Sequence, residues 1–395
     1  METYVHDVAR SLIESDTVSH KSNRQAAAEL ADDLLRFGFD VRLQEVEDGD
    51  SGKVNLVASA GPPVSGGLLI SGHLDVVPYQ DQPGWTQDPL ALTLDGDHVY
   101  GRGTSDMKVF IAHCMDAARR LEPSRLKRPL ALVFTCDEEV GCLGARKFVD
   151  EVDTVLDSVP LPSLAWIGEP TDNRIFRAHK GAVTFGVTVE GVGGHSSLPA
   201  SGVNAISAAG GVLAIIGELE QSMRDATSGA CGELFAEAPY STLNIAAIHG
   251  GTALNMIPER CDIVVNYRPL PDEDPLQPYN TLQSKLRELE TAHRGRSARY
   301  SLSEPFVVPG LLSPAGTSLE KTLRDVLRAE RAAGAPYGTD GGVFAQCGLT
   351  TIVCGPGSIA QAHQPNESIS RQAFESGGAV VSEVIGRFCT EPAHE

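Results

Sequence analysis

Histidines and carboxylates stand at the ends of several apolar runs of this sequence. They are His73, Asp75, Asp137, Glu138, Glu139 and Glu169, and they are joined by Asp106, which begins a predicted helix after GRGTSD, and by His363 in the late loop GPGSIAQAHQP. The apolar runs predict buried strands, and open α/β sheets place their ligands at the carboxyl ends of the strands. So many carboxylates in one place repel one another strongly unless cations lie among them. Imidazole and carboxylate ligands without a nearby thiolate favour a pair of zinc ions, with cobalt or manganese as substitutes.

Each of these residues alone also has a structural explanation. An isolated His73 can be a hydrogen-bonded core histidine, and Asp106 can cap the helix that follows it. Glu138 and Glu139 can form a solvated strand end, and Glu169, which precedes a proline, can begin a turn. Their combined position after apolar strands favours the metal site.

The elements that must position these residues alternate along the first half of the chain. Helical periodicity predicts helices over 23–37 and 106–121. Buried strands are predicted in four runs: GLLISGHLD from Gly67, PLALVFTCDEE from Pro129, LAWIGEP from Leu164 and TTIVCGP from Thr350. Alternating strands and helices indicate the α/β class, with a mostly parallel sheet flanked by helices.

From about Lys180 the pattern changes to longer alternating strands. The runs AVTFGVTVEG, STLNIAAIHGG and CDIVVNYRP are interleaved with predicted helices near 203–220 and 277–293. This order predicts an inserted β-α-β-β-α-β unit of the α+β type. We therefore expect a metal-binding domain in two parts, 1–179 and 298–395, with an inserted α+β domain at 180–297.

Composition excludes several functional classes. A net charge of −20 over 395 residues opposes binding to nucleic acid or to anionic membranes. The first residues lack an apolar core flanked by positive charge, and no window approaches the roughly 18 apolar residues of a spanning helix. We expect a soluble cytoplasmic protein. Its eight scattered cysteines favour reduced structural thiols over disulfides or a zinc-thiolate role.

Several motifs resemble a known family. SGHLDVVP, GWTQDPL, YGRGTSDMKVF, CDEEVGCLGA, IGEPT, HKG, GGHSS, GGTALNMIPERC and GPGSIAQAHQPNE occur in order. They resemble the zinc deacetylase and exopeptidase family of acetylornithine deacetylase, succinyl-diaminopimelate desuccinylase, aminoacylase and glutamate carboxypeptidase. The similarity covers about residues 15–370. DEEVGCLGA, EPT with HKG, GPGSIAQAHQP and the early SDTVSHKSN are most similar to acetylornithine deacetylase.

This resemblance implies a role for each residue at the strand ends. His73 and Glu169 would hold one zinc, Glu139 and His363 the other, and Asp106 would bridge both. Two such ions polarise a scissile carbonyl and activate water. Asp75 would orient His73, and Glu138 would be the general base that takes a proton from water and returns it to the leaving nitrogen.

The resemblance also implies residues outside the metal pair. His195 of GGHSS would reach the site of a neighbouring subunit and stabilise the developing oxyanion, which requires a homodimer formed through the inserted domain. A surface-loop histidine is the alternative. Arg268 and Asn255 would bind the substrate carboxylate, although a structural salt bridge also explains Arg268. Lys180, Asp340 and Gly341 would line the site. Family deacetylases often carry glutamate at the Asp340 position, which leaves the acyl and side-chain preference open.

The expected activity is zinc-dependent removal of an acyl group from a small N-acyl amino acid. N-acetyl-L-ornithine, yielding ornithine and acetate in arginine biosynthesis, is the leading substrate. Acetylcitrulline, acetyldiaminobutyrate and succinyl-diaminopimelate are neighbouring substrates, and a dipeptidase or carboxypeptidase is an alternative with the same chemistry. A non-catalytic metal-binding protein on the same scaffold is the alternative from another class.

Overall fold

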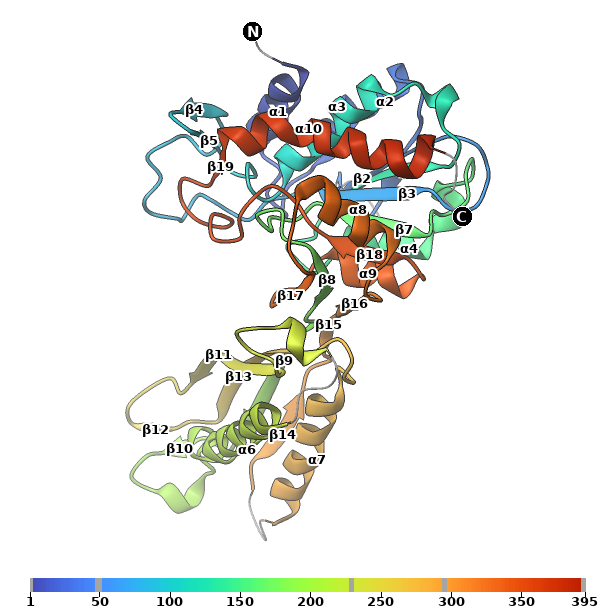
Figure 1. Cartoon of the computed structure of the whole chain (residues 1–395). Helices are drawn as coiled ribbons and strands as arrows, with labels where there is room; N and C mark the ends of the chain where they lie inside the picture. Colours follow the sequence, from blue (N-terminus) through green and yellow to red (C-terminus); the bar gives the residue numbers. More distant parts are fainter. Residues whose placement is uncertain (1–2, 47–51, 227–230, 293–296, 392–395) are drawn as a thin grey trace. The chain divides into compact units, whose positions relative to one another are not determined.

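The computed structural model describes residues 3–46, 52–226, 231–292 and 297–391, which form two compact units (Figure 1). The first unit contains Met1–Ala178, Ser313–Ala333 and Thr339–Glu395. The second contains His179–Leu312 and Gly334–Gly338. Each is described by itself.

A mixed sheet forms the centre of the first unit. Its strands run in the order β1 (Asp40–Glu45), β2 (Val54–Ala60), β6 (Leu130–Thr135), β3 (Leu68–His73), β7 (Leu164–Ile167), β18 (Thr350–Val353) and β8 (Phe176–His179). β6, β3, β7 and β18 are mutually parallel, while β1, β2 and β8 pair in antiparallel fashion. Every residue of β3 and β6 is buried, as expected for strands covered on both faces.

Helices cover this sheet. α1 (Tyr4–Glu14), α2 (Arg24–Arg36), α3 (Lys108–Arg120), α8 (Ser318–Leu327) and α10 (Arg371–Ile385) contribute to one apolar core with the sheet. Figure 1 shows α1, α2, α3 and α10 on the same side of β3. α4 (Leu143–Asp150) and α9 (Asp340–Gln346) pack against each other through Phe148 and Phe344, whose ring centroids are 5.7 Å apart. Short α5 (Val152–Val155) follows α4, and β4 (Thr93–Asp95), β5 (His98–Tyr100) and β19 (Ser368–Ser370) form a small separate sheet.

The second unit is a two-layer α+β structure. Its main elements follow the order β9 (Ala182–Glu190), α6 (Ala205–Asp225), β11 (Thr242–Gly250), β13 (Arg260–Arg268), α7 (Gln277–Ala292) and β14 (Arg299–Leu302). The antiparallel sheet has the order β11-β13-β9-β14, with β15 (Phe306–Val308) also paired to β9. Alternate residues of β9 and β13 are buried and form a core with the two helices.

The α/β class and the predicted helices and strands are confirmed, but one predicted boundary differs from the structure. The sequence pattern returns the chain to the first domain at residue 298, whereas the structure does so at Ser313. Residues 299–308 remain in the second unit because β14 and β15 both pair with β9. All eight cysteines are free and seven are buried. In the described ranges, no helix is both long and apolar enough to cross a membrane.

Candidate metal centre and active site

The predicted ligands of the first unit meet at the carboxyl edge of its parallel strands. His73 is the last residue of β3 and pairs in register with Thr135, the last residue of β6. Glu138 and Glu139 follow β6 by three and four positions, and Glu169 follows β7 by two. The loop after β18 carries His363. Parallel pairing therefore delivers side chains from four separate segments to one edge.

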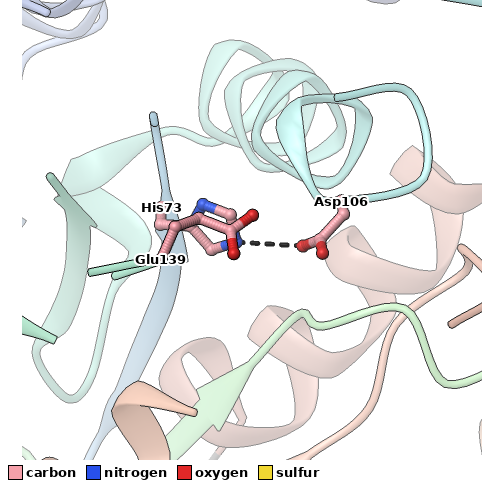
Figure 2. A group of neighbouring side chains, drawn as sticks. All are labelled: His73, Asp106 and Glu139. Carbon is pink, nitrogen blue, oxygen red and sulfur yellow. Dashed lines mark hydrogen bonds and ion pairs between the residues drawn. The ribbon is translucent and has the colours of Figure 1, made fainter. Parts of the chain in front are cut away.

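Asp106 lies two residues before the start of α3, and Figure 2 shows its carboxylate facing His73. Its Oδ1 lies 2.9 Å from His73 Nε2, and its Oδ2 lies 3.3 Å from His363 Nε2. Glu139 Oε1 lies 3.0 Å from the same nitrogen of His363. The helix-cap explanation of Asp106 is wrong, because Met107 is the N-cap residue of α3 and makes no side-chain cap hydrogen bond. Each oxygen of Asp106 instead faces a different histidine.

Glu169 completes the group on the side of His73. Its Oε2 lies 4.0 Å from His73 Nε2, and the residue is only 5% exposed. Its other oxygen, Oε1, is buried and has no hydrogen-bond partner among the described residues. A buried carboxylate oxygen left without a partner is costly, so this atom fits a missing cationic partner.

The electrostatics of the site point to the same need for positive charge. Burial raises the pKa of Glu138 and Glu169, and the charges of neighbouring carboxylates raise them further. Hydrogen bonds with Asp106 and Glu139 raise the pKa of His363 to about 10. Burial opposes ionisation of Asp106, but hydrogen bonds from His363 and His73 outweigh it and lower the pKa. Carboxylates and imidazoles gathered in this way form a donor set that suits divalent cations.

Asp75 contacts both His73 and the turn that carries Glu138 and Glu139. Its backbone oxygen lies 2.9 Å from His73 Nδ1, while its carboxylate lies 3.6 Å from that nitrogen. The carboxylate also accepts hydrogen bonds from the backbone N–H groups of Glu138 and Glu139, at 3.1 and 3.3 Å, and from the Ser19 hydroxyl at 2.7 Å. The backbone oxygen fixes the imidazole, and the carboxylate holds the turn that carries the two glutamates.

Glu367 and Arg102 are functional residues that sequence reasoning missed. Glu367 Oε1 accepts hydrogen bonds from the backbone N–H groups of Ser105 and Asp106, at 2.8 and 3.0 Å. Its Oε2 accepts one from Arg102 at 2.7 Å, and both side chains of this ion pair are 1% exposed. Both residues lie within the quoted motifs YGRGTSDMKVF and GPGSIAQAHQPNE. The motifs could therefore have drawn attention to both residues, but no spacing pattern connects Arg102 with Glu367, which are 265 positions apart.

Asp340 and Gly341 lie at the start of α9 in the first unit, buried rather than exposed to a substrate. Asp340 is 2% exposed, and its Oδ2 accepts a hydrogen bond from the Thr135 hydroxyl at 2.7 Å. It shares a cluster with Glu138 and Cys142. The structure therefore places Asp340 beside the expected general base.

The remaining predicted residues belong to the second unit. His195 and Asn255 are exposed and lie in or beside the short β10 (Gly194–His195) and β12 (Met256–Ile257) pair. Arg268, half-buried, ends β13. Lys180 is 1% exposed, and its ammonium group donates to the Tyr240 backbone oxygen at 2.6 Å. The described contacts of Lys180 are thus contacts within its own unit.

A family comparison agrees with this site. The model of peptidase family M20/M25/M40 matches residues 69–387. The chain belongs to this family. It is accordingly a metallohydrolase, and the matched segment contains every ligand candidate named above.

Solved structures with the same fold include several peptidases. The M20 family metallo-carboxypeptidase Sso-CP2 of Sulfolobus solfataricus superposes with a TM-score of 0.78 at 16% identity, covering 98% of this chain and 99% of its own. A tripeptidase of Staphylococcus aureus gives 0.73 at 17% identity, covering 98% of each chain. The YXEP protein of Bacillus subtilis, described as a dinuclear metal binding peptidase, gives 0.67 at 15% identity, covering 97% of each chain. At these identities the likeness shows a common fold.

We expect Glu367→Gln to weaken metal binding. The amide cannot neutralise the buried Arg102, and the backbone N–H groups that position Asp106 lose a charged acceptor. Metal affinity should fall by roughly 10- to 100-fold, as for other groups that orient a ligand, and the thermal midpoint should drop. Competition with a chelator measures the affinity, and Glu375→Gln, at an exposed ion pair of α10, is the control. Unchanged affinity in Glu367→Gln would contradict the positioning role.

Proposed function

We propose that this chain is a two-metal amide hydrolase that removes an acyl group from the nitrogen of an amino acid. The observation that carries the proposal is Asp106, whose two carboxylate oxygens face His73 and His363 separately. A carboxylate shared in this way is the natural bridge between two ions. The dinuclear character of the Bacillus subtilis relative supports the same assignment.

The first unit offers a ligand set for each ion. His73 and Glu169 would hold one ion, Glu139 and His363 the other, and Asp106 both. Carboxylate and imidazole donors suit zinc, with cobalt or manganese as substitutes. When bound, the ions supply Lewis acidity toward the scissile carbonyl and lower the pKa of water between them.

Glu138 is the group placed to move the proton. It stands next to the ligand Glu139, and it makes no described ion pair with either histidine of the site. Asp75 holds the backbone of both glutamates, so the two side chains have fixed starting points. Glu138 would accept a proton from water and return it to the leaving nitrogen.

Replacing Glu138 with glutamine should abolish most of the activity while leaving the metal site intact. Loss of a general base lowers kcat by roughly 10²- to 10⁴-fold. The metal content of the purified variant, measured by elemental analysis, should equal that of the parent protein. Glu383→Gln, on the exposed face of α10, is a matched control. An active Glu138→Gln enzyme with full metal content would refute the assignment of the base.

N-acetyl-L-ornithine is the substrate we propose, with L-ornithine and acetate as products in arginine biosynthesis. The support is the set of loop motifs that resemble acetylornithine deacetylase. Arg268 offers a guanidinium for the carboxylate common to all N-acyl amino acids, with Asn255 and Lys180 as further contacts. The peptidase names among the structural relatives favour a second candidate, a dipeptidase or carboxypeptidase.

A substrate panel separates these candidates. With added zinc or cobalt, we expect faster acetate release from N-acetyl-L-ornithine than from acetylcitrulline, acetyldiaminobutyrate or succinyl-diaminopimelate. Dipeptides should be cleaved more slowly than any of these amides. Faster cleavage of a dipeptide would favour the peptidase, and the absence of turnover with every acylated diamino acid would exclude the deacetylase.

We further propose that the second unit forms a homodimer and supplies His195 to the neighbouring chain. β11 is the edge strand of its sheet, and six of its nine residues are exposed. Exposed apolar side chains lie on and near this edge: Ile206, Ile245, Ile248, Leu254 and Met256. An apolar open edge of this kind favours pairing with another strand, and a second copy supplies an identical one. His195 pairs with Met256 beside this surface.

Mixing two inactive chains tests the shared site. A dimer of one His195→Ala chain and one Glu138→Gln chain contains one site in which both residues are intact. Random mixing should therefore restore about one quarter of the parent activity for a two-fold dimer. Each variant alone is the control, measured at the same total concentration. No recovery, with mixed dimers present by native mass spectrometry, would place His195 outside the neighbouring site.

A further inference from the structure

A second cluster of metal-binding groups lies behind the catalytic edge of the first unit. Glu138, Cys142 and Asp340 each offer a ligand atom, and these atoms lie within 4.8 Å of one another. Cys142 Sγ is 3.8 Å from Glu138 Oε1. None of the three belongs to the ligand set of the metal pair, and the cluster shares only Glu138 with the proposed catalytic groups.

The fold holds this cluster in place from two directions. Cys142 stands four residues after Glu138, and its backbone N–H donates to the Glu138 carbonyl at 3.0 Å. Cys142 has a left-handed backbone, with φ 59°, and α4 starts at the next residue. Asp340 arrives at the start of α9, which packs against α4. The turn after β6 and the α4–α9 contact thus bring the three side chains together.

Asp340 has an unused ligand atom in the cluster. Thr135 donates to Oδ2, whereas Oδ1 is buried and has no hydrogen-bond partner in the described part of the chain. Both Cys142 and Asp340 are 2% exposed. Burial raises the pKa of the Cys142 thiol, as do the charges of Glu138 and Asp340 and a hydrogen bond between the thiol and Asp340. A cation that displaces the thiol proton would replace this hydrogen bond. The cluster thus offers two carboxylates and a sulfur, and one of these carboxylates has a buried oxygen without a hydrogen-bond partner among the described residues. This donor set suits a cation.

We propose that Glu138, Cys142 and Asp340 form an additional, inhibitory site for a thiophilic divalent cation such as Zn²⁺ or Cd²⁺. Tetrahedral zinc with bonds of about 2.3 Å to sulfur and 2.0 Å to oxygen separates the two ligands by about 3.5 Å. The observed 3.8 Å between Sγ and Oε1 is close to this value. Bound metal deprotonates a coordinating thiol, so the cysteine enters as thiolate and its proton passes to solvent.

Inhibition follows from the proposed function, because this cation would occupy Glu138. A base that coordinates a cation cannot accept a proton from water, so metal beyond the catalytic pair should slow turnover. Only the inhibitory effect rests on the role of Glu138. The binding of the cation is independent of it and can be measured without substrate.

Cadmium titration of the zinc-loaded, full-length protein tests the site directly. Coordination by Cys142 should produce ultraviolet thiolate-to-cadmium charge-transfer absorption, saturating at one added equivalent per chain while zinc stays bound. Cys142→Ser should lose this absorption, and Cys347→Ser, at a half-buried cysteine at the end of α9, should keep it. The absence of absorption in the parent protein, or its persistence in Cys142→Ser, would overturn the proposal.

Turnover in the presence of excess Zn²⁺ provides the second measurement. The zinc concentration that halves the rate should rise at least about tenfold in Cys142→Ser, since even groups that only orient a ligand contribute 10- to 100-fold to affinity. Each rate is expressed relative to that of the same protein without excess zinc, because Cys142 contacts the proposed base Glu138. Cys347→Ser should behave as the parent. If the parent protein turns over none of the substrates, the cadmium absorption still decides the site, and the two proposals fail separately. Equal inhibition of the parent and Cys142→Ser would show that excess zinc acts elsewhere.

Discussion

The structure of the first unit depends on holding several buried carboxylates at one edge of a sheet. Glu139 and Glu169 approach His73 because β3, β6 and β7 are parallel and end together, and Asp106 joins them from the segment before α3. Burial, and then the charges of neighbouring carboxylates, raise the pKa of Glu138 and Glu169. Divalent cations offset repulsion among carboxylates. The parallel strands that gather these groups at one edge therefore favour a metal-dependent chemistry there.

The protein surrounds these carboxylates with groups that fix them in place. The buried Arg102–Glu367 pair holds the backbone before α3, and Asp75 holds the turn after β6. A second buried ion pair, Lys53–Asp137 at 2.6 Å, anchors the residue that precedes Glu138. Buried pairs of this kind contribute little net stability compared with apolar packing. They position ligands that would otherwise move apart.

Sequence reasoning singled out His73, Glu139 and Glu169 as ligand candidates because their signal is local: each follows an apolar run. It could not connect Glu367 to Asp106, since that contact joins residues 261 positions apart through backbone N–H groups. The boundary near 298 was placed too early for a related reason. β14 and β15 are short strands, and their membership of the second unit is decided by pairing with β9 rather than by their own pattern. The resemblance named candidate roles for His195 and Arg268 that no spacing could assign.

Reaction and specificity are carried by different parts of the sequence. The proposed metal ligands and the proposed base all lie in the first unit, whereas Arg268, Asn255 and His195, proposed to contact the substrate or the oxyanion, lie at strand ends and loops of the second. Changes in those loops leave the carboxyl edge of β3, β6 and β7 untouched, which allows one hydrolytic centre to serve different acylated substrates. Asp340 also lies in the first unit, with the proposed ligands and base. It is buried against Thr135 and grouped with Glu138, so a longer glutamate there must be accommodated inside packed structure. An aspartate at position 340 therefore directly affects the surroundings of Glu138, and any effect on the choice of acyl group is secondary.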